Sequence, residues 1–217
     1  RCSVFAGGFD LSGACAITAS SDEFATLDQL DALVRKSLLI ADRSSGRTRF
    51  SMLETIRQFA EEQLTQGDSA GETRAAHAGY FAGREADVMA TWDSPRQREA
   101  YTWFTLELPN LRAAFRWAAD NRDLDTATSI AIYASFLGSL VEQHEPVAWA
   151  EEMIEPAKAA EHRRLAQLYA VAAECHEAGR FEDFLRYAAA GEAAIESGRF
   201  DPIPDLFETM VASGYLT

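Results

Sequence analysis

The stretch FSMLETIRQFAEEQL, Phe50–Leu64, changes its periodicity at Met52. Up to Met52 the residues alternate as in a strand, and apolar residues then recur at helical spacing at Leu53, Ile56, Ala60 and Leu64, with Phe59 widening the apolar stripe. We therefore expect a strand that ends at Met52 and a helix that starts at Leu53. Leu53 is expected to be a core residue, so its truncation to alanine should cost about 2–5 kcal/mol.

The residues before this stretch predict two helices and a β-hairpin. One short helix is expected over residues 11–18, and a second carries Leu27, Leu30, Val34 and Leu38 on one face. Thr26 with Gln29 fits a capping box at the start of that second helix. The turn residues DRSSG precede the alternating run RTRFSM, in which Phe50 and Met52 would pin the hairpin to the core. The order helix, helix, hairpin, helix is the layout of a winged helix, which we place at residues 1–67.

After the small and polar run QGDSAGET, residues 68–217 read as helices without a convincing strand. Pro109 is expected to open a helix whose buried stripe is Leu111, Ala114, Phe115 and Ala118. Gly179 suits a left-handed helix cap, and Cys175 reads as a small core residue. Short links between the helices predict an array of antiparallel helical hairpins. The fold class is therefore mainly α, with a small winged helix before a helical array.

The composition describes an ordinary globular chain of 217 residues with a net charge of −14. It contains no apolar run long enough to span a membrane and no signal peptide, so we expect no membrane partner. Three cysteines without CxxC spacing favour a reducing, cytoplasmic compartment. Because the chain starts at Arg1 rather than Met, it reads as a piece of a longer polypeptide.

We find no pattern that predicts catalysis, a metal site or a cofactor site. No GxxxxGK[ST] loop is present, and the double glycine Gly7–Gly8 reads as a turn. The histidines at 77, 144, 162 and 176 have neither HExxH nor Cys/His ligand spacing. A cluster of aromatic residues either fills helix interfaces or marks a ligand groove; its members are Trp92, Trp103, Phe104, Phe115 and Trp117. We therefore expect this chain to be no enzyme and to hold no cofactor.

Four segments, CSVFAGGFDLSGA, LDALVRKSLL, FSMLETIRQFAEEQL and WFTLELPNLRAAFRWA, together resemble a known family. They are similar to the middle region of bacterial transcriptional regulators of the signal-transduction ATPase (NB-ARC-like) class, including LuxR-type and cyclase-linked members. The resemblance implies that the winged helix clamps an upstream ATPase domain, which would bind ATP and Mg²⁺. It also implies that the tetratricopeptide-like array senses a protein or small-molecule signal. Related winged helices carry an M-H-D motif, for which this chain has Met52-Leu53-Glu54, so histidine-based nucleotide sensing is not expected.

A basic cluster around the hairpin is the candidate interaction patch. Its members, which we call the wing patch, are Arg35, Lys36, Arg43, Arg47, Arg49 and Arg57. With Asp42 and Glu54 the local charge is +4, and phosphate contacts need such charge. Against DNA binding, Asp28 and Asp31 lie near the start of the candidate recognition helix, and residues 67–217 carry −12. We expect the wing patch to dock an acidic protein surface, with DNA binding by the basic wing as the alternative.

Overall fold

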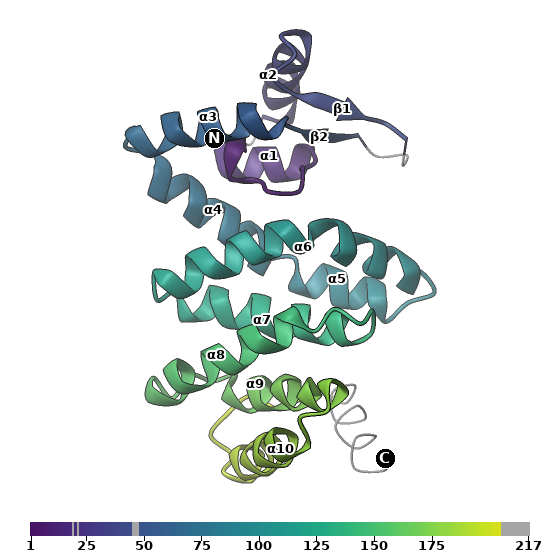
Figure 1. The fold of residues 1–217 in the computed structure, drawn as a ribbon, viewed down its shortest axis with the longest axis vertical. Helices are drawn as coiled ribbons and strands as arrows, with labels where there is room; N and C mark the ends of the chain where they lie inside the picture. The colour runs from purple at the N-terminus through teal and green to yellow at the C-terminus, as the bar shows by residue number, and fades with distance from the viewer. Residues whose placement is uncertain (19, 21, 45–47, 205–217) are drawn as a thin grey trace. The chain divides into compact units, whose positions relative to one another are not determined.

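A computed structural model describes residues 1–18, 20, 22–44 and 48–204. The N-terminal elements are η1 (Cys2–Val4), α1 (Leu11–Thr18), α2 (Glu23–Arg35), β1 (Ile40–Asp42), β2 (Arg49–Ser51) and α3 (Glu54–Gln66). Helices α1, α2 and α3 lie beside a two-stranded hairpin (Figure 1). This order confirms the winged-helix layout.

The hairpin is tied to the core through Phe50. Strands β1 and β2 are antiparallel, with Ala41 opposite Phe50 and Asp42 opposite Arg49. Phe50 also exchanges two backbone hydrogen bonds with Phe9, at 2.7 and 2.8 Å. Its buried ring stacks on that of Phe9, whose ring in turn stacks on Phe5. The predicted role of Phe50 is confirmed, and Met52 is half-buried.

Gly8 allows this close approach between the N-terminal loop and strand β2. Its φ is +84°, a backbone conformation in which a side chain is strained, and a Cβ built there would lie 2.9 Å from the carbonyl oxygen of Phe50. The turn predicted at Gly7–Gly8 is therefore present between η1 and α1.

Gly8→Ala is expected to lower the free energy of unfolding by at least about 2 kcal/mol, because the strained conformation and the contact with the Phe50 carbonyl act together. Chemical denaturation measures the change. Gly71→Ala is the matched control, since a Cβ there meets nothing within 4 Å and alanine is the better helix former. Equal stability of Gly8→Ala and the native chain would contradict this account of the turn.

Two local predictions for the N-terminal elements were wrong. Leu53 is the cap residue before α3 and is 57% exposed, so its truncation does not remove core packing, and Phe59 is exposed as well. Helix α2 begins earlier than the capping box predicted, because the Asp22 side chain caps it by accepting a hydrogen bond from the Ala25 amide at 2.9 Å. Thr26 then lies inside the helix, where its hydroxyl donates to the Asp22 carbonyl.

The described residues from 68 to 204 form helices and no strand. They are α4 (Ala70–Ala82), α5 (Glu85–Trp92), α6 (Gln97–Asp120), α7 (Leu124–Ser139), α8 (Glu145–Ala159), α9 (Leu165–Ala172), η2 (Ala173–Ala178) and α10 (Phe181–Glu196). Consecutive helices from α7 to α10 are joined by short links, and each packs against the next (Figure 1). A helical array therefore follows the winged helix, as the sequence predicts.

Pro109 does not open a helix, which corrects the prediction: it lies inside the 24-residue α6. The predicted stripe of Leu111, Ala114, Phe115 and Ala118 is nevertheless fully buried. Gly179 has the left-handed conformation expected of it, with φ +76°. Cys175 is buried, and burial raises the pKa of its thiol to about 11, so the sulfur stays protonated at neutral pH as a small core group.

The chain forms two compact units. The first consists of Arg1–Arg84 with Thr105–Trp117, and the second of Glu85–Phe104 with the described part of Ala118–Thr217. Helix α6 supplies residues to both units. The domain boundary after Gly67 stays a prediction.

Candidate interaction surfaces

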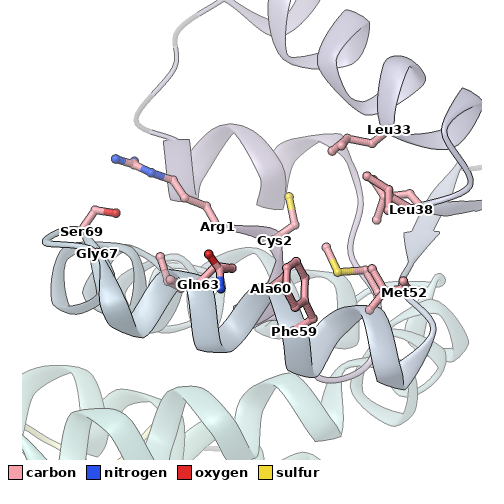
Figure 2. Close-up of a pocket in the computed structure, with 13 residues that line it drawn as sticks. Arg1, Cys2, Leu33, Leu38, Met52, Phe59, Ala60, Gln63, Gly67 and Ser69 are labelled. Atoms are coloured by element: carbon pink, nitrogen blue, oxygen red, sulfur yellow. The ribbon is translucent and has the colours of Figure 1, made fainter.

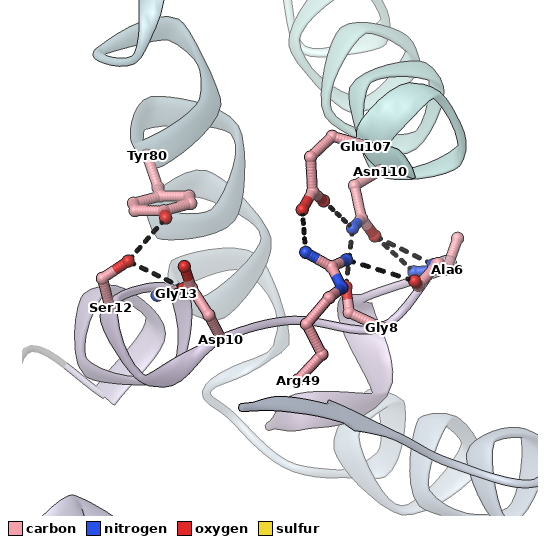
Figure 3. Close-up of polar contacts among 10 residues, drawn as sticks. Ala6, Gly8, Asp10, Ser12, Gly13, Arg49, Tyr80, Glu107 and Asn110 are labelled. Carbon is pink, nitrogen blue, oxygen red and sulfur yellow. Dashed lines mark hydrogen bonds and ion pairs between the residues drawn. The ribbon is translucent and has the colours of Figure 1, made fainter. Parts of the chain in front are cut away.

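Arg49 of the wing patch is engaged inside the first unit rather than held out to solvent (Figure 3). Its guanidinium forms an ion pair with the buried carboxylate of Glu107 on α6. The same guanidinium donates to the Gly7 carbonyl at 3.4 Å. Glu107 also accepts a hydrogen bond from the Asn110 amide at 2.6 Å. Arg49 therefore links strand β2 to helix α6.

Asn110 completes this network by holding the N-terminal loop. Its Oδ1 accepts from the amides of Ala6 and Gly7 at 2.7 and 3.1 Å, and its Nδ2 donates to the Gly8 carbonyl at 2.8 Å. Asn110 is fully buried. A buried amide in this position pairs backbone groups that would otherwise lose hydrogen bonds, so it fixes the loop that carries Phe5 and Phe9.

A second polar contact joins α1 to α4 on the same unit. Asp10 accepts from the Gly13 amide at 2.9 Å and from the Ser12 hydroxyl at 2.7 Å. The Tyr80 hydroxyl lies 2.8 Å from Ser12 (Figure 3). Burial raises the pKa of Tyr80, so its hydroxyl is a neutral hydrogen-bonding group at neutral pH.

Two further arginines of the wing patch are paired with carboxylates on their own helices. Arg57 donates to both carboxylate oxygens of Glu54, at 2.8 and 2.9 Å, and these hydrogen bonds lower the pKa of Glu54 to about 2. Arg35 forms an ion pair with Asp31 one turn earlier on α2. These carboxylates neutralise the charge that a phosphate would need.

Lys36 and Arg43 are the wing-patch residues left without an ion-pair partner among the residues that the structure describes. Both are exposed: Lys36 directly follows α2, and Arg43 directly follows β1. Arg47 falls outside the described residues. The structure therefore does not present the predicted patch as one set of free cations.

The outward side of α2, where a recognition helix would contact bases, is acidic and partly apolar. Phe24 is 83% exposed and Leu27 is 42% exposed. Glu23, Asp28 and Asp31 are exposed on the same helix. This surface differs from the cationic one that a DNA-reading helix needs.

An apolar groove of about 490 Å³ lies between the end of α2 and helix α3 (Figure 2). Its lining side chains are mainly aliphatic and aromatic: Cys2, Leu33, Leu38, Leu39, Met52, Ile56, Phe59, Ala60 and Leu64. Its polar lining comes from Arg1, Gln63 and Ser69, and the Arg1 guanidinium donates to the Ile17 carbonyl at 3.1 Å. Sequence reasoning missed this groove, although the signal was present: Phe59 widens the apolar stripe of α3 beside Ile56.

Trp92 and Trp103 of the aromatic cluster pack against helix α7. Trp92 contacts Phe136 edge-on, with ring centroids 5.0 Å apart, and its Nε1 donates to the Tyr101 hydroxyl at 3.1 Å. Trp103 lies against Tyr133, and Phe104 is fully buried. These contacts favour the packing role over a ligand groove.

Across residues 1–18, 20, 22–44 and 48–204, no group of three or more His, Cys, Asp or Glu side chains has an arrangement that could hold a metal ion. Within the same residues, no helix combines the length and apolar character needed to cross a bilayer.

Comparison with known families identifies the N-terminal fold. Residues 1–65 match a family model described as a winged helix-turn-helix domain. The chain therefore contains a winged helix-turn-helix domain, as the elements from α1 to α3 show.

Comparison with curated proteins finds mycobacterial relatives. A "putative HTH-type transcriptional regulator" of Mycobacterium tuberculosis and one of Mycobacterium bovis are each 42% identical over 134 residues, which cover 60% of this chain and 15% of theirs. An uncharacterised protein of M. tuberculosis is 39% identical over 83 residues, 37% of this chain and 20% of its own. The chain thus spans about 15% of the length of the regulators it matches. No solved structure matches.

Proposed function

We propose that this chain is a non-catalytic, protein-contacting part of a larger transcriptional regulator, in which the winged helix binds another protein domain rather than DNA. The resemblance in its sequence and the regulators to which it is similar support the regulatory role.

One observation carries the preference for protein over DNA: the arginines Arg35, Arg49 and Arg57 are already paired with carboxylates. A phosphate would have to displace Asp31, Glu107 or Glu54 from these side chains. Glu107 is buried, so its separation from Arg49 would leave a carboxylate unpaired out of water, which is costly.

The acidic character of the chain supports the same choice. Residues 1–66 carry seven basic and nine acidic side chains, a net charge of −2, within a chain of −14. A duplex with one negative charge per about 1.7 Å of its axis is repelled by such a field. A protein surface carries no such obligatory charge.

From the family resemblance we further infer what each part of the chain binds. The winged helix clamps an ATPase domain that lies elsewhere in the full polypeptide and holds ATP and Mg²⁺. The helical array binds a protein or small-molecule signal and relays it, within the cytoplasm, to a LuxR-type DNA-binding output domain. This chain itself holds no cofactor.

DNA binding by the wing is the second candidate. Lys36 and Arg43 favour it, because both are exposed and neither has an ion-pair partner within the described part of the chain. The helix-turn-helix relatives also point in this direction.

A titration of the whole chain with fluorescein-labelled duplex DNA separates the two candidates. We expect no binding tighter than about 10 μM at a salt concentration of about 150 mM, because too few free cations are available for phosphate contacts. The readout is fluorescence anisotropy, repeated at lower salt.

Two variants make this test specific. Lys36→Ala/Arg43→Ala removes the free cations of the wing patch, and Lys158→Ala/Arg199→Ala removes the same charge from exposed positions of the second unit. Micromolar binding that weakens steeply with salt and is lost only in the first variant would overturn the proposal in favour of DNA binding.

A further inference from the structure

We propose that the outer face of α2 is a docking surface for a basic, amphipathic helix of another protein. This inference rests on the proposed function, since it names the chemistry of the protein that the winged helix contacts. We define the α2 face by Phe24, Leu27, Asp28 and Asp31, flanked by Glu23.

The geometry of α2 places these side chains together. Positions 24, 27, 28 and 31 are separated by three, four and seven residues, so they lie on one side of the helix. Leu30 and Thr26 are buried and fix the opposite side toward the core. The four side chains therefore form one outward stripe.

The apolar part of the stripe is unusually exposed for a folded chain. At 83%, the Phe24 side chain is more exposed than any other large hydrophobic residue that the structure describes. Leu27 follows one turn later on the same side and is 42% exposed. An aromatic and an aliphatic side chain one turn apart form the type of anchor that a partner helix covers when it packs along another helix.

The acidic side chains around this apolar anchor favour a basic partner. Residues 22–35 carry four acidic side chains and one basic one. Glu23 and Asp28 have no ion-pair partner among the described residues, and Asp31 is paired with Arg35 on the same helix. Two unpaired carboxylates beside an apolar anchor attract lysine and arginine, and an arginine can also stack on the exposed ring of Phe24.

This charge excludes two other occupants. Nucleic acid is repelled, because its phosphates would face the carboxylates of the stripe. The helical part of the same chain is unfavourable as well, since residues 67–217 carry a net charge of −12. A basic helix of another protein has the complementary charge.

The test uses the whole chain and an amphipathic helical peptide of about 18 residues. Leucine residues form one face of this peptide, and lysine residues fill the rest. A second peptide replaces each lysine with glutamate. Fluorescence anisotropy gives the dissociation constants. We expect the lysine peptide to bind and the glutamate peptide not to bind.

Two variants assign that binding to α2. Phe24→Ala and Glu23→Gln/Asp28→Asn should each raise the dissociation constant of the lysine peptide about tenfold, since they remove the anchor and its unpaired charges. The control Glu62→Gln/Asp68→Asn removes the same charge from other exposed positions of this unit and should change it less than about twofold. Circular dichroism shows that each variant remains folded.

Three outcomes would overturn the inference: no binding of the lysine peptide, unchanged affinity in Phe24→Ala, or an equal loss in the control variant, which would mean general attraction to an acidic protein. None of these affects the choice between protein and DNA. That choice fails only if duplex DNA binds through Lys36 and Arg43.

Discussion

A fragment that ends at Gly67 is expected to show no cooperative thermal unfolding transition, although it contains the whole predicted winged helix. The core of the first unit is completed by residues beyond that point. The ring of Phe5 packs edge-on against His77 and Phe81 of α4, with centroids 4.9 and 6.5 Å apart. In the fragment these contacts are lost.

The free energy lost with these contacts is large compared with the stability of a small domain. Burying one phenylalanine contributes about 1.5–3 kcal/mol, and whole domains are stable by only about 5–15 kcal/mol. The fragment exposes Phe5 and also loses Asn110, which holds the backbone of residues 6–8. The remaining helices and hairpin therefore lack enough buried surface to fold.

Circular dichroism and differential scanning calorimetry measure this outcome. A fragment that ends at Asp120 is the matched control, because it includes α4 and the part of α6 that carries Asn110, and it should retain a cooperative transition. A sharp transition in the shorter fragment would instead uphold a domain boundary after Gly67.

Acidification from pH 6.5 to pH 4 is expected to cost the chain about 3 kcal/mol through His77 alone. The ring of His77 is 3% exposed among Phe5 and Phe81, and its Nε2 is buried without a hydrogen-bond partner. Burial lowers the pKa of His77 to about 4, compared with an ordinary 6.5.

The sign of this change in the free energy of unfolding follows from proton binding. Above pH 6.5 His77 is neutral in both the folded and the unfolded chain, so it makes no difference. Below pH 6.5 the unfolded chain binds a proton that the buried ring cannot accept, so the free energy of unfolding falls until about pH 4. Below that pH the folded ring is protonated too, and this contribution stays constant.

Urea denaturation at a series of pH values measures this dependence. His77→Phe should remove the loss of about 3 kcal/mol, because a phenyl ring fits among the neighbouring aromatic rings and binds no proton. His144→Gln, at an exposed position, is the control and should keep the loss. Parallel pH curves for the native chain and His77→Phe would contradict the burial of a neutral ring.

Local patterns in the sequence were sufficient for much of the fold. The change of period at Met52 correctly placed the end of β2 and the start of α3 within two residues. Gly179 was identified because only a residue without a side chain adopts its conformation easily. These signals depend only on residues that are close together in the chain, so one sequence is enough to find them.

The prediction for Pro109 failed because a proline in a helix can occupy either of two positions. Proline suits the first turn of a helix, yet it also occurs inside one where the freed carbonyl can reach water. Here Thr105, four residues earlier, is exposed. The helical pattern of residues 97–108 was the stronger signal.

The wing patch shows what a single sequence cannot provide. Arg49 and Glu107 are 58 residues apart, so no periodicity connects them. The available signal was the position of Glu107 and Asn110 on the buried side of a helix, between Phe104 and Leu111. Polar side chains in such a stripe indicate partners elsewhere in the fold.

The first compact unit is assembled from two separate stretches, because Thr105–Trp117 in the middle of α6 belongs to it and the residues on either side do not. A single genetic crossover between residues 85 and 104 would therefore separate Asn110 from the loop that it holds. A chimaera joined there would contain the winged helix but not the Asn110 that holds its N-terminal loop. A junction just beyond Trp117 would instead divide the second unit, which includes Glu85–Phe104, so the winged helix and the array are expected to be inherited as one block.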